Sequence, residues 1–311
     1  MITRISDSTF SPLRQEINLS EATMAASIRM VCGIVFGKRY EEEGVETKRF
    51  LQITRGFSML TSSFFVSDYF PAFGLVDEIS GRVKRADAMC KGMDEFYQEL
   101  IDEHLESRRK KEIKDEEDML DVLIKLKEDE SSSNGLTWNN IKGLLMNMIV
   151  AATETTPAVT IWTMTALMKA PKAIKKLQNE IRSLVGEKGK VDEDDLPKLP
   201  YLKAVVNESM RERSTVLGNP DEFVPERFLN SGIDSKGQDF GLVPFGSGRR
   251  MCSGVSMGFL ATELMVANLV YSFDWELPRG IHAQDLDTNP TSGLAVHKKN
   301  ALILVPKRYG L

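Results

Sequence analysis

The chain has 311 residues, enough for roughly two ordinary domains or one large one. Hydrophobic residues make up 42% of it and charged residues 27%, a globular composition that excludes disordered, collagen-like and disulfide-scaffold proteins. The net charge of −5 provides no general attraction to nucleic acid. Three cysteines and three histidines are too few for a disulfide framework, and they make a histidine-based metal site a poor prospect.

No uninterrupted apolar run approaches the roughly 18–20 residues that cross a bilayer. The longest candidate, 144–152, is short and contains Asn147, and the N-terminal residues have no apolar signal core. The composition therefore predicts a reduced, soluble and mostly helical protein.

Hydrophobic periodicity predicts at least eight helices and few strands, so that the fold class is mainly α. The predicted helices cover 18–37, 46–64, 77–109, 119–126, 137–169, 171–185, 201–213 and 255–273. Aromatic, proline and glycine residues at 67–74 indicate an ordered loop, and the mixed charges of 108–118 indicate a solvated loop. Near the C-terminus, 302–305 is typical of a strand.

The most informative segment is the glycine-rich run 244–254, PFGSGRRMCSG. It places the thiol of Cys252 at the start of a predicted helix, two residues after Arg250. Such a position favours the thiolate, which is the form that binds metals and attacks substrates. A buried structural cysteine, a phosphate-binding loop and a cysteine protease are the alternatives at this point. The glycine spacing fits neither common phosphate-loop pattern, and no histidine lies nearby in the sequence.

Several motifs of this chain occur in the order that is characteristic of one family. FGSGRRMCSG matches FxxGxRxCxG, the haem-binding loop of the cytochrome P-450 family, at Phe245, Gly248, Arg250, Cys252 and Gly254. Glu208 and Arg211 match the ExxR helix of that family, and 225–228 matches its PERF segment. The run 151–156, AATETT, is similar to its oxygen-activating motif. Over almost its whole length the chain resembles a plant member of the cytochrome P-450 family, whose products belong to secondary metabolism.

This resemblance implies one incomplete cytochrome P-450 domain over 1–311, mainly α with a few short strands. It implies that Cys252 is the axial thiolate ligand of haem iron and that Arg250 pairs with a haem propionate. Phe245 would pack beside the sulfur, and Gly248 and Gly254 would complete the cofactor-binding loop.

The resemblance also assigns roles outside the cysteine loop. Glu208, Arg211 and Arg227 would form a buried network that locks the loop under the haem. Thr155 and Glu154 would deliver protons to oxygen bound at the iron. The alternative for these two is that they cap each other inside a buried helix.

Pro157 follows the oxygen-activating motif and cannot donate a hydrogen bond to the carbonyl of Thr153. In the family the corresponding helix is opened at this motif. We therefore expect the helix to be opened here.

As a function, the resemblance implies a haem-thiolate monooxygenase that inserts one atom of molecular oxygen into a small hydrophobic metabolite. Its electrons would come from NADPH through a flavoprotein reductase, and no nucleic acid would bind. Members of the family sit on the cytosolic face of the endoplasmic reticulum membrane. Without an anchor, this chain would make at most peripheral membrane contact or be cytoplasmic.

Two departures from the family pattern lead to a competing hypothesis. The N-terminal anchor and the early helices of the family would precede the first residue of this sequence. In addition, only 13 residues separate Arg211 from Pro225, where the family has a helix and several strands, so that a segment is deleted there. The alternative is a catalytically inactive truncated relative, a haem-binding or interaction fragment without turnover.

Overall fold

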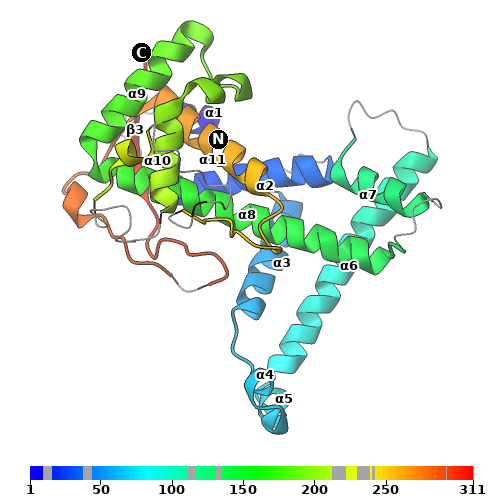
Figure 1. Ribbon diagram of the computed structural model, residues 1–311. Coiled ribbons are helices and arrows are strands. Elements are labelled where there is room, and N and C mark those ends of the chain that lie inside the picture. Colours follow the sequence, from blue (N-terminus) through cyan, green and yellow to red (C-terminus); the bar gives the residue numbers. More distant parts are fainter. Residues whose placement is uncertain are drawn as a thin grey trace. The chain divides into compact units, whose positions relative to one another are not determined.

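The computed structural model describes nearly all of the chain (Figure 1), namely residues 1–9, 16–37, 44–110, 117–129, 135–211, 222–229, 239, 242–291 and 293–310. It divides into two compact units, each treated separately below. Unit 1 consists of Met1–Ala25, Thr155–Thr291 and Val296–Leu311, and unit 2 consists of Ala26–Glu154 and Ser292–Ala295. Two long helices, α2 (Leu19–Phe36) and α8 (Trp138–Lys169), belong in part to each unit.

Unit 1 combines helices with one small antiparallel sheet. Its other helices are α1 (Ile2–Thr9), α9 (Pro171–Val185), α10 (Pro200–Met210) and α11 (Val255–Ser272), with 3-10 turns η2 (Gly186–Lys188), η3 (Glu193–Lys198), η5 (Pro225–Phe228) and η6 (Ala283–Asp285). Its strands are β1 (Ile17–Asn18), β2 (Phe273–Glu276) and β3 (Ile303–Arg308), and β3 lies between the other two. Leu304 pairs with Ile17, and Pro306 pairs with Trp275.

The core of unit 1 forms where α11 packs against α9 and α10. Leu177 and Ile181 of α9 and Leu269 of α11 are fully buried in it. The first turn of α10 is held by Glu180 of α9, whose carboxylate accepts hydrogen bonds from the N–H groups of Tyr201 (2.8 Å) and Leu202 (3.0 Å). These helices therefore support both the cysteine loop before α11 and the ExxR segment at the end of α10.

Unit 2 is entirely helical in its described part. It contains α3 (Val45–Thr61), α4 (Val66–Tyr69), η1 (Pro71–Phe73), α5 (Leu75–Ile79), α6 (Arg82–Arg109) and α7 (Met119–Glu128). Helix α6 packs against α3, α5 and α7. Phe50 of α3 and Phe96 of α6 meet edge to face with ring centroids 6.3 Å apart, and both rings are buried.

The prediction of one helix over 77–109 and a loop over 67–74 was wrong in detail. The chain turns at Gly81, whose φ of +71° breaks the helix into α5 and α6. The 67–74 segment forms α4 and η1 because the buried carboxylate of Asp77 accepts hydrogen bonds from the N–H groups of Val66 (3.2 Å) and Ser67 (2.8 Å). A contact ten residues away in sequence thus decides the local structure.

The expectation that no segment is apolar enough to cross a membrane was also wrong. By length and composition, α2, α8 and α11 each reach the necessary hydropathy over 18 residues. The sequence argument required uninterrupted apolar runs, whereas these helices contain scattered polar residues and few charges. Between 44% and 56% of each such window is buried inside the protein, so these helices also supply its core.

Candidate functional site

The loop that precedes α11 is closed by its own backbone. The N–H of Cys252 donates to the carbonyl of Phe245 over 2.9 Å, and the N–H of Met251 donates to the carbonyl of Gly248, also over 2.9 Å. These bonds fix the position of Cys252 relative to the start of the helix.

One glycine of this loop has a conformational role that the motif does not single out. Gly246 adopts a φ of +78°, the left-handed region that favours glycine. Gly254 has a φ of −91°, and a Cβ built at Gly248 would have open space around it. A Cβ at Gly254 would lie 3.7 Å from Sγ of Cys252, so the sulfur sits beside this glycine.

The ring of Phe245 fastens the loop to α11. A Cβ at Gly258 would lie 3.2 Å from Cε1 of this ring, so the ring rests on the first turn of the helix. The Phe245 ring also packs against the ring of Phe259 in a tilted arrangement, with the two ring centroids 4.9 Å apart. The structure thus places the Phe245 ring against α11, and the predicted packing of this ring beside the sulfur stays a prediction.

The thiol is open to a ligand. Cys252 forms no disulfide and is exposed, and Gly254, the N-cap of α11, makes no side-chain hydrogen bond to the helix start. Because a Cβ built at Gly254 would lie 3.7 Å from Sγ of Cys252, the sulfur is close to the N-terminus of α11 and to the positive end of its dipole. Arg249 and Arg250 are exposed next to it. One available sulfur with cationic neighbours fits a haem, which needs an axial thiolate and partners for its carboxylates.

The three residues predicted for the Glu-Arg-Arg network do meet. Glu208 accepts hydrogen bonds from Nε (3.2 Å) and Nη2 (3.1 Å) of Arg211 and from the N–H of Val224 (3.2 Å). Nε of Arg227 forms an ion pair with Oε2 of Glu208 at 2.9 Å. The side chains of Glu208, Arg211 and Arg227 are 1%, 4% and 12% exposed. The network therefore ties the end of α10 to η5.

The oxygen-activating motif lies in the middle of α8. Glu154 is buried, at 9% exposed, whereas Thr155 is exposed. Ala151, one turn earlier, is exposed as well, so this part of α8 presents an uncovered side. The expected opening of the helix is not seen, because α8 continues as an α-helix through Pro157.

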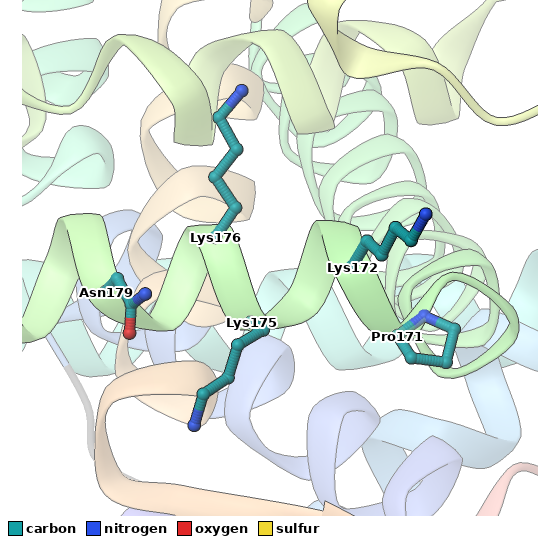
Figure 2. Close-up of a pocket in the computed structure, with 5 residues that line it drawn as sticks. All are labelled: Pro171, Lys172, Lys175, Lys176 and Asn179. Atoms are coloured by element: carbon teal, nitrogen blue, oxygen red, sulfur yellow. The ribbon is translucent and has the colours of Figure 1, made fainter.

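The pocket shown in Figure 2 contains none of the predicted site residues. It is lined by residues of α9, namely Pro171, Lys172, Lys175, Lys176 and Asn179. The lysine side chains point in different directions, and Nζ of Lys176 is held by Glu226 at 2.7 Å. The ammonium groups of these lysines therefore do not converge on one point, and we assign no ligand to this pocket.

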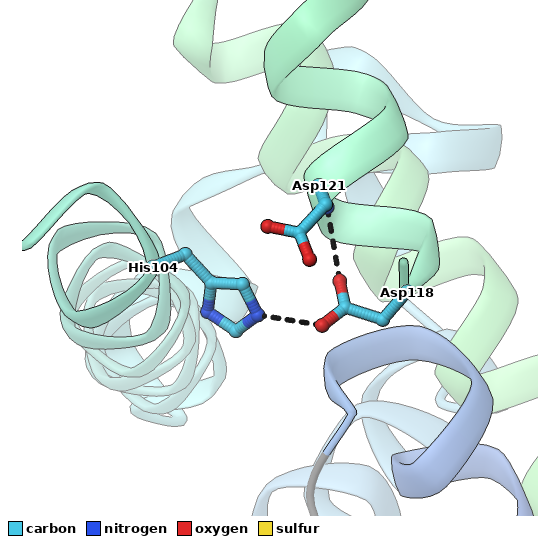
Figure 3. A group of neighbouring side chains, drawn as sticks. All are labelled: His104, Asp118 and Asp121. Carbon is cyan, nitrogen blue, oxygen red and sulfur yellow. Dashed lines mark hydrogen bonds and ion pairs between the residues drawn. The ribbon is translucent and has the colours of Figure 1, made fainter. Parts of the chain in front are cut away.

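A buried polar cluster joins α6 to α7 (Figure 3). Nδ1 of His104 lies 2.9 Å from the carbonyl of Leu100, and Nε2 lies 3.0 Å from Oδ2 of Asp118. Both ring nitrogens of His104 are thus engaged, one with the backbone of its own helix and the other with Asp118. The other oxygen of Asp118 caps α7 by accepting from the N–H of Asp121 (2.9 Å). This cluster was not predicted, because Asp118 closes the 108–118 charge run, which was assigned to a solvated loop. Residues 111–116 of that run lie outside the described residues.

The comparisons with known proteins agree with these motifs. The family model described as Cytochrome P450 matches residues 3–218 and 212–305. The chain is 41% identical to 6,7,8-trihydroxycoumarin synthase of Pastinaca sativa and 37% identical to 5-OH-xanthotoxin synthase of Ammi majus, over 99% of this chain and 68% of each relative. It is 36% identical to cytochrome P450 71A1 of Persea americana, over 99% of this chain and 69% of the relative.

The alignments also bear on the predicted deletion between Arg211 and Pro225. The two matches of the family model overlap at 212–218, and residues 212–221 lie outside the described part of the structure. The alignment with the trihydroxycoumarin synthase covers 353 positions, 42 more than the length of this chain, so at least that many of its positions have no residue here. Because the family model matches on both sides of this point and accounts for nearly the whole sequence, the chain belongs to the cytochrome P450 family.

Proposed function

We propose that this protein is a haem-thiolate monooxygenase with Cys252 as the ligand of the haem iron. Cytochrome P450 enzymes use haem and are oxidoreductases, which sets the class of chemistry. The observation that carries the assignment to Cys252 is its exposed, free thiol just before the start of α11, inside the family's cysteine motif. Haem bound there supplies the activation of molecular oxygen and its insertion into the substrate.

The loop residues of this chain hold and shield the sulfur. The hydrogen bond from the N–H of Cys252 to Phe245 fixes the backbone, and the Phe245 ring packs against α11 and keeps water from that side. The N–H groups of the first turn of α11 lower the electron density on the sulfur. Arg250 is exposed, so its guanidinium is available for a propionate.

Glu154 and Thr155 are proposed to move protons. With haem bound, the buried carboxyl group of Glu154 and the exposed hydroxyl of Thr155 would relay protons to the site where oxygen is activated. Adjacent acid and alcohol groups are the combination that such a transfer needs.

For the substrate, we propose a small aromatic oxygen heterocycle of the coumarin type. The support is the names of the relatives, a trihydroxycoumarin synthase and a hydroxyxanthotoxin synthase, together with their identity over nearly all of this chain. An NADPH-dependent flavoprotein reductase is the proposed electron donor. The proposed location is the cytosolic face of the endoplasmic reticulum membrane.

A specific observation favours a second candidate, an inactive relative that binds haem without turnover. At least 42 positions of the trihydroxycoumarin synthase have no counterpart in this chain. In the family, the segment after the ExxR helix helps to line the substrate pocket and to hold the haem. Its shortening therefore weakens substrate binding before it affects the thiol.

The deciding experiment uses the full chain supplied with haem, a plant flavoprotein reductase, NADPH and dihydroxycoumarins. The expected result is an NADPH-dependent product heavier by one oxygen atom, with the label incorporated when the gas phase is ¹⁸O₂. A haem-loaded protein that consumes no NADPH above the reductase background and forms no product would establish the inactive alternative.

A further inference from the structure

Buried threonine side chains recur along α8, and Thr153 differs from three of them. The hydroxyls of Thr160, Thr163 and Thr165 each donate to the carbonyl four residues earlier, at 2.9, 2.8 and 2.7 Å. Thr153 is equally buried, at 1% exposed. Within the described part of the chain, its Oγ1 has no hydrogen-bond partner. A buried hydroxyl without a partner destabilises a protein, so this side chain requires an explanation.

The backbone carbonyl of Thr153 cannot form its regular helical hydrogen bond. In a regular α-helix the carbonyl of Thr153 would accept from the N–H of residue 157. Residue 157 is proline, which has no N–H, although α8 continues through it. Thr153 therefore has two polar atoms to consider: Oγ1, which has no partner in the described structure, and the carbonyl oxygen, which cannot accept the regular helical hydrogen bond from residue 157.

The surroundings at this level of α8 are already polar. Ser27 of α2 is fully buried, and its hydroxyl donates to the carbonyl of Ala152 over 3.1 Å. A polar side chain of α2 thus reaches the backbone of α8 at Ala152, the residue before Thr153. Buried water molecules occupy sites of this kind, where two to four otherwise unsatisfied polar groups converge.

We propose that Thr153 binds a buried water molecule through Oγ1 and through its own carbonyl oxygen. The water donates to the carbonyl oxygen and accepts from the hydroxyl, so both atoms are satisfied. Thr153 immediately precedes Glu154 and Thr155. As a consequence that rests on the proposed function, the water belongs to the route by which protons reach that pair, and Thr153 is a positioning residue.

Crystal structures of the full chain and of two variants test the site directly. The wild-type protein and Thr153→Ser are expected to show an ordered water within hydrogen-bond distance of the residue 153 hydroxyl and carbonyl, and Thr153→Val is expected to lose it. A dry site in the wild-type protein, with the Thr153 hydroxyl turned onto the carbonyl of Ile149, would overturn the proposal.

Thermal unfolding provides a second test that does not depend on turnover, so it separates this proposal from the proposed function. If water satisfies the hydroxyl, Thr153→Val lowers the melting temperature, as does the control Thr160→Val, which removes a hydroxyl with a known protein partner. A higher melting temperature for Thr153→Val would mean that the hydroxyl is unsatisfied in the folded protein, and the proposal would be wrong.

The consequence for proton supply has its own measurement in protein that turns over. Thr153→Val is expected to release more hydrogen peroxide per NADPH consumed than Thr160→Val, with Thr153→Ser restoring the wild-type ratio. Equal ratios in the two valine variants would overturn the assignment of Thr153 as a positioning residue.

Discussion

Replacing Glu208 by glutamine removes the one negative charge that the structure places between Arg211 and Arg227. The three side chains are between 1% and 12% exposed, and the carboxylate contacts both guanidinium groups at 2.9–3.2 Å. Removing one partner of a buried ion pair leaves the other charge buried and uncompensated, at about 3–5 kcal/mol. Because Glu208→Gln removes the carboxylate that both guanidinium groups contact, we expect a loss of unfolding free energy of about that size.

Urea denaturation followed by far-ultraviolet circular dichroism measures this loss as a shift of the transition midpoint. The matched control is Glu95→Gln, which removes an exposed partner of Lys91 on α6, with Nζ and Oε1 3.8 Å apart. An exposed pair of this spacing contributes about 0.3–0.5 kcal/mol. A loss for Glu208→Gln that is no larger than that of Glu95→Gln would refute the conclusion that the network holds α10 and η5 together.

Three further predictions concern other parts of the structure and are tested by thermal unfolding. Gly37→Ala should destabilise the protein by at least about 1–2 kcal/mol, because Gly37 has a φ of +64° and an added Cβ would lie 2.7 Å from Oδ2 of Asp118. The control Gly33→Ala, at a position of α2 with open space around it, should stabilise the protein by about 0.5–1 kcal/mol. Equal effects of the two substitutions would contradict this prediction. Burial raises the pKa of Glu263, so the charged carboxylate opposes folding above that pKa. Glu263→Gln should therefore have a higher melting temperature than the wild-type protein at pH 7, and the difference should vanish as acid protonates the wild-type carboxyl group. An equal melting temperature at pH 7 would contradict this prediction. The hydrogen bond from the N–H of Ser67 holds the pKa of Asp77 below its usual range. The ionised carboxylate therefore stabilises the fold above about pH 3.9, and this stabilisation disappears as the pH falls through the lower pKa that Asp77 has in the folded protein. Asp77→Asn should lose this acid dependence of the melting temperature, and an unchanged pH profile would exclude a role of the Asp77 carboxylate in stability.

Much of the site was predictable because its residues are tied to local motifs. The spacing of the cysteine loop predicted a thiol at the start of a helix, and the structure places Cys252 just before α11. The order of the ExxR and PERF motifs predicted that Glu208 and Arg227 meet, although they are far apart in sequence. The conformational role of Gly246 was missed because the motif leaves that position free.

The remaining features depend on contacts between distant residues, which periodicity does not reveal. Strand β1 has only two residues, and it exists because Ile17 pairs with Leu304 near the other end of the chain. Similarly, the buried position of Asp118 follows from His104 on α6, and nothing in a run of charges indicates it. The opening of α8 before Pro157 was predicted incorrectly: the helix continues through this residue, although proline cannot donate to the carbonyl of Thr153.

The central claim is that Cys252 supplies the thiolate to haem iron, and the absorbance of the reduced, carbon monoxide-treated protein tests it most directly. Cys90 is also exposed and free, so Cys90→Ala is the matched control for Cys252→Ala. The wild-type protein and Cys90→Ala are predicted to show the thiolate-type Soret band, and Cys252→Ala is predicted to lack it. A band that persists in Cys252→Ala, or a haem-loaded wild-type protein without it, would contradict the assignment.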